Sequence, residues 1–384
     1  MKQNSIYKKA LYLAVPMMIQ NGITNAVSLV DNLMVGSLGT EKMTAVSIAG
    51  QLFFVFFLAV FGGLSGPGIY SAQYFGQGNK EGYQKIFRLK VWITALLTVV
   101  GVIVFLVGGE WLIGLYLKGS GGNLDAGLTL ESALSYLRIM LIGLVPFAIT
   151  QIYAGSLREM GESMKPMLAG LVSVVVDIVF NYFLIYGKFG FPRLEVKGAA
   201  IATVMARFAE MFVVIIWTHV EIEKYSFLKN VYRTLRISLQ EMMPVIIKGL
   251  PIFFNEFLWA GGMAVLTQCY SMKGLEVIAG LNISNAICNL LNVVFIAMGN
   301  AVGIIMGQFL GASKFEEAKK NANKLMWFTA MLCVGLTVIL IILSGVFPRA
   351  YNTTDEIRNL GRWFIIITAA FFPLQGFLNV LYFT

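Results

Sequence analysis

Ten long hydrophobic runs divide the chain, and charged side chains are sparse within them. A helix needs about 20 consecutive apolar residues to cross the hydrocarbon core of a bilayer. The pattern therefore predicts ten transmembrane helices. We place them at residues 9–36, 45–74, 88–108, 133–154, 166–187, 198–219, 246–270, 280–308, 325–347 and 361–383. The expected fold class is an all-α integral membrane protein.

An internal repeat runs through these helices. The matching positions are 235 residues apart, and most are Pro, Gly, Gln or charged residues. The pairs are Pro16 and Pro251, Gln73 and Gln308, Gly76 and Gly311, Glu81 and Glu316, and Lys85 and Lys320. Six predicted helices separate the two starting points, so both copies begin on the same side of the membrane. Parallel repeats of this kind are typical of secondary transporters.

The repeat predicts two helical lobes. We expect an N-terminal six-helix lobe at 1–220, a cytoplasmic linker at 221–245 and a C-terminal lobe at 246–384. The stretch 235–243 is a candidate amphipathic surface helix within the linker. The C-terminal lobe contains only four of the six helices that the first copy has. We therefore expect a truncated chain or a partial gene product, with two helices missing.

Composition excludes a soluble protein, because 58% of the residues are hydrophobic and only 13% are charged. The basic residues behind the net charge of +9 are distributed according to the predicted membrane topology. With a cytoplasmic N-terminus, 18 of the 29 Lys and Arg residues lie inside and nine lie in the opposite loops, which fits the positive-inside rule. A nucleic-acid-binding protein would instead carry a clustered basic face. We predict a multi-pass protein of the cell membrane, plasma or inner, with a cytoplasmic N-terminus, that binds no nucleic acid.

The cysteines carry no metal or disulfide signal. Cys269, Cys288 and Cys333 lie in hydrophobic runs without CxxC spacing, so we expect buried thiols and no structural metal. The first hydrophobic run is too long for a signal peptide and should remain as the first helix. Membrane enzymes usually carry His pairs or Asp-rich clusters at the membrane face, and this chain has a single His. We predict that the protein is not an enzyme and needs no cofactor.

Polar residues follow one face of the first predicted helix at steps of three or four. They are Asn21, Thr24, Asn25, Ser28, Asp31 and Asn32. A single polar residue in a membrane helix usually forms an interhelical hydrogen bond. A stripe of six that ends in a carboxylate is typical of the wall of a hydrated cavity. We predict that Asp31 is functional and that Asn21, Asn25 and Ser28 line the substrate cavity.

The fifth predicted helix offers a partner for Asp31. Ser173, Asp177 and Asn181 follow at four-residue steps and share one face. Two carboxyl groups close together in a low dielectric resist ionisation, so the pair can take up a proton. It can also bind Na⁺, with the Asn181 carbonyl as a neutral ligand. The residues alone leave H⁺ and Na⁺ both open.

Other polar residues in the predicted helices are less specific. Glu256 lies five residues after Pro251 and could meet a positive charge on the substrate. Asn282, Asn285, Asn289 and Asn292 form a stripe that either lines the cavity or joins helices. We include Glu256, Asn282 and Asn285 in the predicted cavity. Arg207 and Glu210, three residues apart, most simply neutralise each other.

Four motifs carry a resemblance to a known family. They are 30–39 (Val-Asp-Asn-Leu-Met-Val-Gly-Ser-Leu-Gly), 72–76 (Ala-Gln-Tyr-Phe-Gly), 157–161 (Leu-Arg-Glu-Met-Gly) with Lys165 and Pro166, and 198–203 (Gly-Ala-Ala-Ile-Ala-Thr). In this order, and in register with the repeat, they resemble the multidrug and toxic compound extrusion (MATE) family of antiporters. The resemblance covers almost the whole chain. It implies two helical lobes around a cavity that opens alternately to each side.

The resemblance also implies a function. We expect export of cationic or amphipathic small molecules in exchange for Na⁺ or H⁺, by a monomer surrounded by lipid. Thr203, which ends the fourth motif, completes the predicted ion-coupling set of Asp31, Asp177 and Asn181. Family members often carry Asn and then Asp at the last two positions, whereas this chain has Asp177 and then Asn181. In this chain the charged carboxyl is therefore one helical turn earlier than in those family members.

The alternatives are a lipid-linked oligosaccharide flippase of the same superfamily, an integral-membrane enzyme and a non-transporting fragment. A flippase would need Arg or Lys in its cavity for the phosphate. Acidic residues outnumber basic ones inside the predicted helices, which favours cationic cargo.

Overall fold

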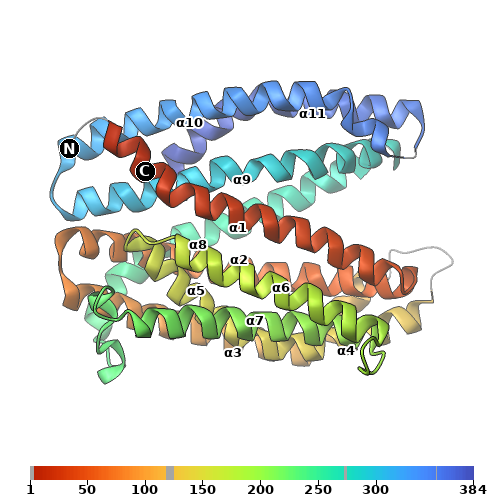
Figure 1. Ribbon diagram of the computed structural model, residues 1–384, viewed down its shortest axis with the longest axis horizontal. Coiled ribbons are helices and arrows are strands. Elements are labelled where there is room, and N and C mark those ends of the chain that lie inside the picture. Colours follow the sequence, from red (N-terminus) through yellow and green to blue (C-terminus); the bar gives the residue numbers. More distant parts are fainter. Residues whose placement is uncertain (1–3, 118–124, 272–274, 352) are drawn as a thin grey trace. The chain divides into compact units, whose positions relative to one another are not determined.

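The computed structural model describes residues 4–117, 125–271, 275–351 and 353–384, and the regular structure of these residues is helical (Figure 1). The α-helices are α1 (Asn4–Gly36), α2 (Thr40–Gln77), α3 (Lys80–Leu117), α4 (Ala126–Met140), α5 (Leu144–Glu159), α6 (Met164–Tyr186), α7 (Glu195–Val220), α8 (Leu239–Ser271), α9 (Leu275–Gly311), α10 (Phe315–Ser344) and α11 (Asp355–Phe383). Short 3₁₀ helices are η1 (Leu141–Gly143), η2 (Ser226–Leu228), η3 (Val231–Arg233) and η4 (Phe347–Ala350).

The number of membrane spans agrees with the sequence prediction. Within the described residues, ten helical segments are long and apolar enough to cross a bilayer. The fourth of them consists of α4, η1 and α5 together. Pro146 explains the break at η1, because proline has no amide hydrogen for the helix and its ring disfavours the preceding turn. The prediction of an all-α membrane protein is therefore confirmed.

The chain divides into two compact units by its internal contacts. The α3–α7 unit contains Ile23–Ser71 and Asn79–Glu256, and the α9–α11 unit contains Met1–Gly22, Ala72–Gly78 and Phe257–Thr384. This division cuts through α1, α2 and α8, so it differs at those helices from the predicted lobe boundaries.

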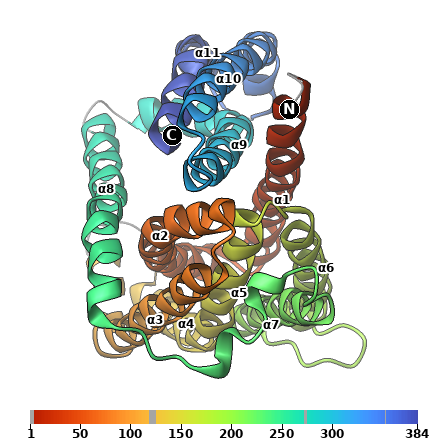
Figure 2. The same cartoon turned by 90° about the vertical axis from the view of Figure 1, so that its left-hand side faces the viewer.

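The α3–α7 unit is a helical bundle, seen nearly end-on in Figure 2. Helices α6 and α7 form a closely packed hairpin, and α7 also packs against α4 and α5. The largest core cluster contains the fully or nearly fully buried side chains of Phe53, Phe56, Phe105, Leu137 and Leu144. Burying rings and branched side chains between helices gives this unit a well-packed interior in which polar groups need partners.

The α9–α11 unit packs α11 against α9 and α10. The start of α1 joins this unit through side chains at helical spacing. These are Ile6, Ala10, Leu13, Ala14 and Met17, in one cluster with residues of α9, α10 and α11. On the same part of α1, the Lys9 ammonium donates a hydrogen bond of 2.9 Å to the side-chain oxygen of Gln308.

The segment that follows α7 is tied to the α3–α7 unit by charge pairs. Lys165 pairs with Glu221, and Lys224 donates to Glu162 over 2.9 Å. The hydrogen bond from Lys165 lowers the pKa of Glu221, and the hydrogen bond to Glu162 raises the pKa of Lys224. The predicted surface helix at 235–243 is wrong at its start, because residues 234–238 are not helical and α8 begins at Leu239.

Two glycines of the repeat form a close helix crossing inside the α9–α11 unit. A Cβ atom on Gly76 of α2 would lie 2.0 Å from the backbone oxygen of Gln308 in α9. A Cβ on Gly311 of α9 would lie 1.8 Å from the backbone oxygen of Gln73 in α2. The repeat-related pairs thus contact each other reciprocally. Only glycine allows the two backbones to approach this closely.

We predict that Gly76→Ala and Gly311→Ala each destabilise the protein, because a methyl group at either position forces α2 and α9 apart. The expected cost is about 1–3 kcal/mol, as for other overpacked sites. Thermal unfolding of the detergent-solubilised protein measures it. Gly50→Ala is the matched control, since nothing lies within 4 Å of a Cβ there, on the same helix. Equal melting of Gly76→Ala and Gly50→Ala would contradict the crossing.

Candidate functional site

The polar stripe on α1 is largely open. Asn21, Thr24, Asn25 and Ser28 are exposed, and the Ser28 hydroxyl donates to the backbone oxygen of Thr24 over 3.0 Å. Asp31, near the end of the stripe, is half-buried. The stripe therefore leads along α1 from accessible amides to a carboxyl group that is directed into the α3–α7 unit.

Asp31 meets α6 at a buried polar contact. The side-chain amide of Asn181 donates a hydrogen bond of 2.9 Å to an oxygen of Asp31. Asn181 is 1% exposed and Asp177, one turn earlier on α6, is 7% exposed. The prediction placed these two residues on one helical face. That face is the side of α6 turned toward the interior of the unit.

The two carboxyl groups face each other. The Asp31 carboxyl interacts with the Asp177 carboxyl, and Asp177 also interacts with the hydroxyl of Thr203 in α7. Two ionised carboxylates that interact in a low dielectric repel each other, so a proton or another cation would stabilise the pair. The four residues predicted for ion coupling thus form one cluster contributed by α1, α6 and α7.

The cluster contains hydrogen-bond acceptors that have no partner. One carboxyl oxygen of Asp177 and the amide oxygen of Asn181 are buried without a hydrogen-bond partner among the described residues. Buried oxygens are normally paired, so unpaired ones need an explanation such as a bound ion. Carboxylate, amide and hydroxyl oxygens are the ligands that hard cations prefer.

Sequence reasoning missed Tyr136, which lies on α4. Its side chain is buried, and its hydroxyl interacts with Thr203. A Tyr within a membrane span that is otherwise mostly apolar was the available signal, because a buried phenol needs a polar partner. Arg207 was noticed, but only as a neutralising partner of Glu210. Its guanidinium lies 4.7 Å from the ring centre of Phe57 and 4.9 Å from that of Phe147.

The other predicted cavity residues belong to α8 and α9. Glu256 on α8 is half-buried and lies against α2, where a Cβ on Gly62 would be 3.5 Å from its Cγ. Asn282 and Asn285 are exposed on α9, in the other unit. On the same stripe, the Asn292 amide donates to Asn289 over 3.2 Å.

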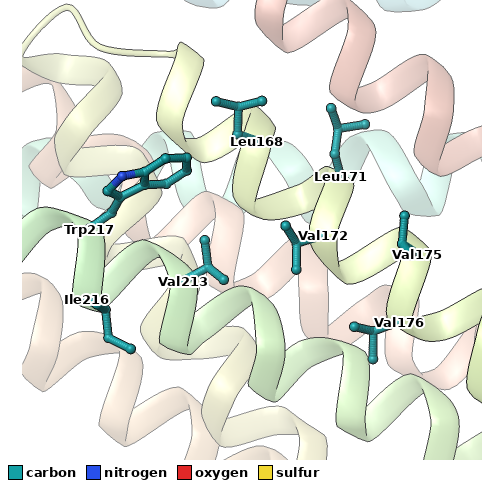
Figure 3. A pocket seen from close by; sticks show the side chains of 8 residues that line it. All are labelled: Leu168, Leu171, Val172, Val175, Val176, Val213, Ile216 and Trp217. Atoms are coloured by element: carbon teal, nitrogen blue, oxygen red, sulfur yellow. The ribbon is translucent and has the colours of Figure 1, made fainter.

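A groove between α6 and α7 is a different kind of site (Figure 3). It has a volume of about 610 Å³ and is lined by Leu168, Leu171, Val172, Val175, Val176, Val213, Ile216 and Trp217. The α6 residues of this lining lie mainly on the side of the helix away from Asp177. Its apolar lining supplies no ligand for a cation, so the carboxyl cluster remains the candidate for ion coupling.

Comparison with known proteins identifies the family. The MatE family profile matches residues 16–183 and again residues 251–383. The chain belongs to the MatE family. The two matches begin at Pro16 and Pro251, which is the offset of the internal repeat. As a MatE protein, the chain is a multi-pass, ion-coupled membrane transporter for small molecules and not an enzyme.

Relatives and solved structures agree with this membership. The chain is 25% identical over 374 residues to the probable multidrug resistance protein YoeA of Bacillus subtilis, covering 97% of this chain and 79% of that protein. It is 24% identical to the multidrug resistance protein MdtK of Klebsiella pneumoniae, covering 95% and 78%. A crystal structure of a mutant Vibrio cholerae MATE transporter, VcmN, superposes with a TM-score of 0.88 at 16% identity, covering 99% and 83%. Another, of a MATE protein in a bent conformation, has a TM-score of 0.81 at 21% identity, covering 98% and 82%.

We predict that Asn181→Leu weakens Na⁺ binding at the cluster. Leucine has a similar volume but carries no amide oxygen that could serve as a Na⁺ ligand. Replacing a residue that supports a cation site typically costs about 10- to 100-fold in affinity. The shift in unfolding temperature on adding Na⁺ measures the change. Asn32→Leu, on the exposed part of α1, should leave that shift as in the wild type.

Proposed function

We propose that this MatE transporter exports cationic or amphipathic compounds and that its coupling ion binds at Asp31, Asp177, Asn181 and Thr203. The contact between the two carboxyl groups carries the proposal, because it is a site that gains stability only when a cation is present. The names of the relatives YoeA and MdtK, which are multidrug resistance proteins, support a drug-like substrate range.

The coupling ion is Na⁺ or H⁺. Na⁺ would use the carboxyl oxygens, the free amide oxygen of Asn181 and the Thr203 hydroxyl as ligands. A proton would be shared between Asp31 and Asp177. In both cases the bound cation removes negative charge from the end of the α1 stripe.

Exchange follows from that change of charge. A cationic compound on the stripe, near Asn25 and Ser28, is attracted by the carboxyl groups while they are ionised. When the coupling cation binds from outside, the attraction falls and the compound is released outward. Each elementary charge moved through 100 mV contributes about 2.3 kcal/mol. One or two elementary charges moved net per cycle would therefore support gradients of roughly 40-fold to roughly 2,000-fold.

Glu256, Asn282 and Asn285 belong to the proposed substrate cavity. Glu256 supplies a negative charge for the cargo, and the two amides supply hydrogen bonds. We assign residues 1–220 and 246–384 to the two moving lobes and 221–245 to a cytoplasmic linker. We assign the N-terminus to the cytoplasm of a bacterial cell, which the distribution of basic residues supports, and we propose that the protein acts as a monomer in the inner membrane.

We predict that Asp31→Asn and Asp177→Asn each reduce coupled transport at least about tenfold, because the amide cannot exchange charge with the ion. Drug-induced ion flux in everted vesicles measures this, first under a Na⁺ gradient and then under a pH gradient. The gradient that drives wild-type flux also identifies the ion.

Glu223→Gln is the control for these variants. Glu223 is an acid outside the membrane-spanning helices that pairs with Lys229, so coupled flux should remain at the wild-type level. Coupled flux that persists unchanged in both aspartate variants would remove the carboxyl cluster from the mechanism. Flux of neutral or anionic cargo alone would favour a flippase-like transporter.

A further inference from the structure

The connection between α7 and α8 is fastened to one face of α3, which it passes on its way to α8 (Figure 2). Three side chains of α3, spaced four residues apart, donate hydrogen bonds to backbone oxygens of this connection. The bonds run from Gln84 to Lys229 (2.8 Å), from Arg88 to Val231 (2.9 Å) and from Trp92 to Leu235 (3.0 Å). Side chains at this spacing share one helical face. Residues 229–236, which we call the docked segment, are therefore held against α3.

The docked segment lies where the lipid-facing part of α3 begins. From that point onward, exposed hydrophobic side chains follow α3 at steps of three or four. They are Trp92, Leu96, Val99, Ile103 and Leu106. In a membrane helix such a stripe faces the acyl chains, and Trp is enriched at the boundary with the headgroups. Because the Trp92 indole donates to Leu235, this bond places the docked segment at the level of the headgroups.

The docked segment exposes aromatic, aliphatic and basic side chains together. Tyr232, Arg233, Leu235 and Arg236 are all exposed, and so is Trp92 beside them. Aromatic rings with a polar edge and long basic side chains both suit the boundary between water and hydrocarbon. We call these five side chains the basic–aromatic surface.

The acids around the basic–aromatic surface are already paired with lysines. The pairs are Glu221 with Lys165, Glu223 with Lys229 and Glu241 with Lys85. In contrast, neither Arg233 nor Arg236 forms an ion pair within the part of the chain that the structure describes. The surface therefore carries two guanidinium groups whose positive charge no neighbouring carboxylate offsets.

An anionic phospholipid has the chemistry that matches this surface. Guanidinium groups bind phosphate oxygens through paired, charge-assisted hydrogen bonds. The rings of Trp92 and Tyr232 and the side chain of Leu235 suit the glycerol region and the first methylene groups of the lipid. A free phosphate ion would contact only the two arginines and would leave this apolar part unused.

We propose that Trp92, Tyr232, Arg233, Leu235 and Arg236 bind the headgroup region of an anionic phospholipid. Because α3 already holds the backbone of the docked segment, binding costs little ordering of the chain. The inference is independent of the coupling mechanism. It rests on the proposed function only through the cytoplasmic N-terminus, which assigns this surface to the cytoplasmic leaflet.

The test measures lipid binding to the full-length protein in a neutral detergent, without transport. Phosphatidylglycerol is titrated while thermal unfolding is recorded, with phosphatidylcholine of the same acyl chains and inorganic phosphate as separate comparisons. We expect saturable stabilisation by phosphatidylglycerol only. For Arg233→Gln and Arg236→Gln we expect the half-saturating lipid concentration to rise roughly fivefold each, and roughly 25-fold in the double variant.

The matched control is the double variant Lys188→Gln with Lys197→Gln. Both lysines are exposed near the start of α7, whereas the docked segment follows its end. Neither lysine forms an ion pair among the described residues, so this variant also loses two uncompensated positive charges. Its half-saturating phosphatidylglycerol concentration should equal that of the wild type.

Four results would overturn the inference. Wild-type affinity in the double arginine variant would exclude the two guanidinium groups, and an equal loss in the double lysine variant would show attraction by net charge alone. Equal stabilisation by phosphatidylcholine would remove the need for an anion. Equal stabilisation by inorganic phosphate would assign the site to a soluble anion.

Failure of the proposed function gives different results. A reversed orientation would appear as labelling of Arg236→Cys by a membrane-impermeant maleimide in right-side-out vesicles and not in everted ones. Failure of the coupling site would appear as normal coupling in Asp31→Asn and in Asp177→Asn. Neither result would change lipid binding in detergent.

Discussion

A charged side chain inside a bilayer is stable only if another charge or a dense set of polar groups compensates it. This constraint organises the interior of the α3–α7 unit. Lys90 and Glu159 satisfy it within hydrogen-bonding distance, and Arg207 satisfies it through aromatic faces and nearby acids. Asp31 and Asp177 do not satisfy it by themselves, because they face each other. The unit therefore contains one acidic pair that a proton or another cation would compensate, as the proposed function requires.

The packing of the surrounding helices holds the side chains of this cluster together. Helices α6 and α7 form a tight hairpin, which fixes Asp177 and Asn181 against Thr203. Helix α1 supplies Asp31, which accepts the hydrogen bond from Asn181. The turn at η1 lets α4 and α5 present Tyr136 and Phe147 to the same region. A local break in one span thus serves the placement of several side chains.

Much of this arrangement could be predicted from the sequence. Long apolar runs give the spans, because membrane insertion depends on length and hydropathy more than on detailed packing. The four-residue spacing of Asp177 and Asn181 gave their common face, and the polar stripe on α1 pointed to Asp31. The offset of the repeat also matched the two segments of the family match.

The parts of the site that the sequence did not reveal depend on contacts between helices that are distant in sequence. Nothing in the sequence around Arg207 indicates that Phe57 and Phe147 enclose it, since these residues come from two other helices. The role of Tyr136 likewise depends on its distance from Thr203. The non-helical stretch 234–238 was missed because its sequence pattern is amphipathic. In the structure, the Trp92 indole donates to the backbone oxygen of Leu235, and the Arg236 amide donates to the Thr234 hydroxyl.

The reciprocal crossing of α2 and α9 has a consequence for how the protein can evolve. At Gly76 and Gly311 the neighbouring atom is a backbone oxygen, which every amino acid possesses. No change of side chain at Gln73 or Gln308 can therefore make room for a larger residue at these glycines. Second-site suppressors should be absent at the contact itself, and laboratory selection for new drug resistance should leave both glycines unchanged while the open amides of α1 diversify.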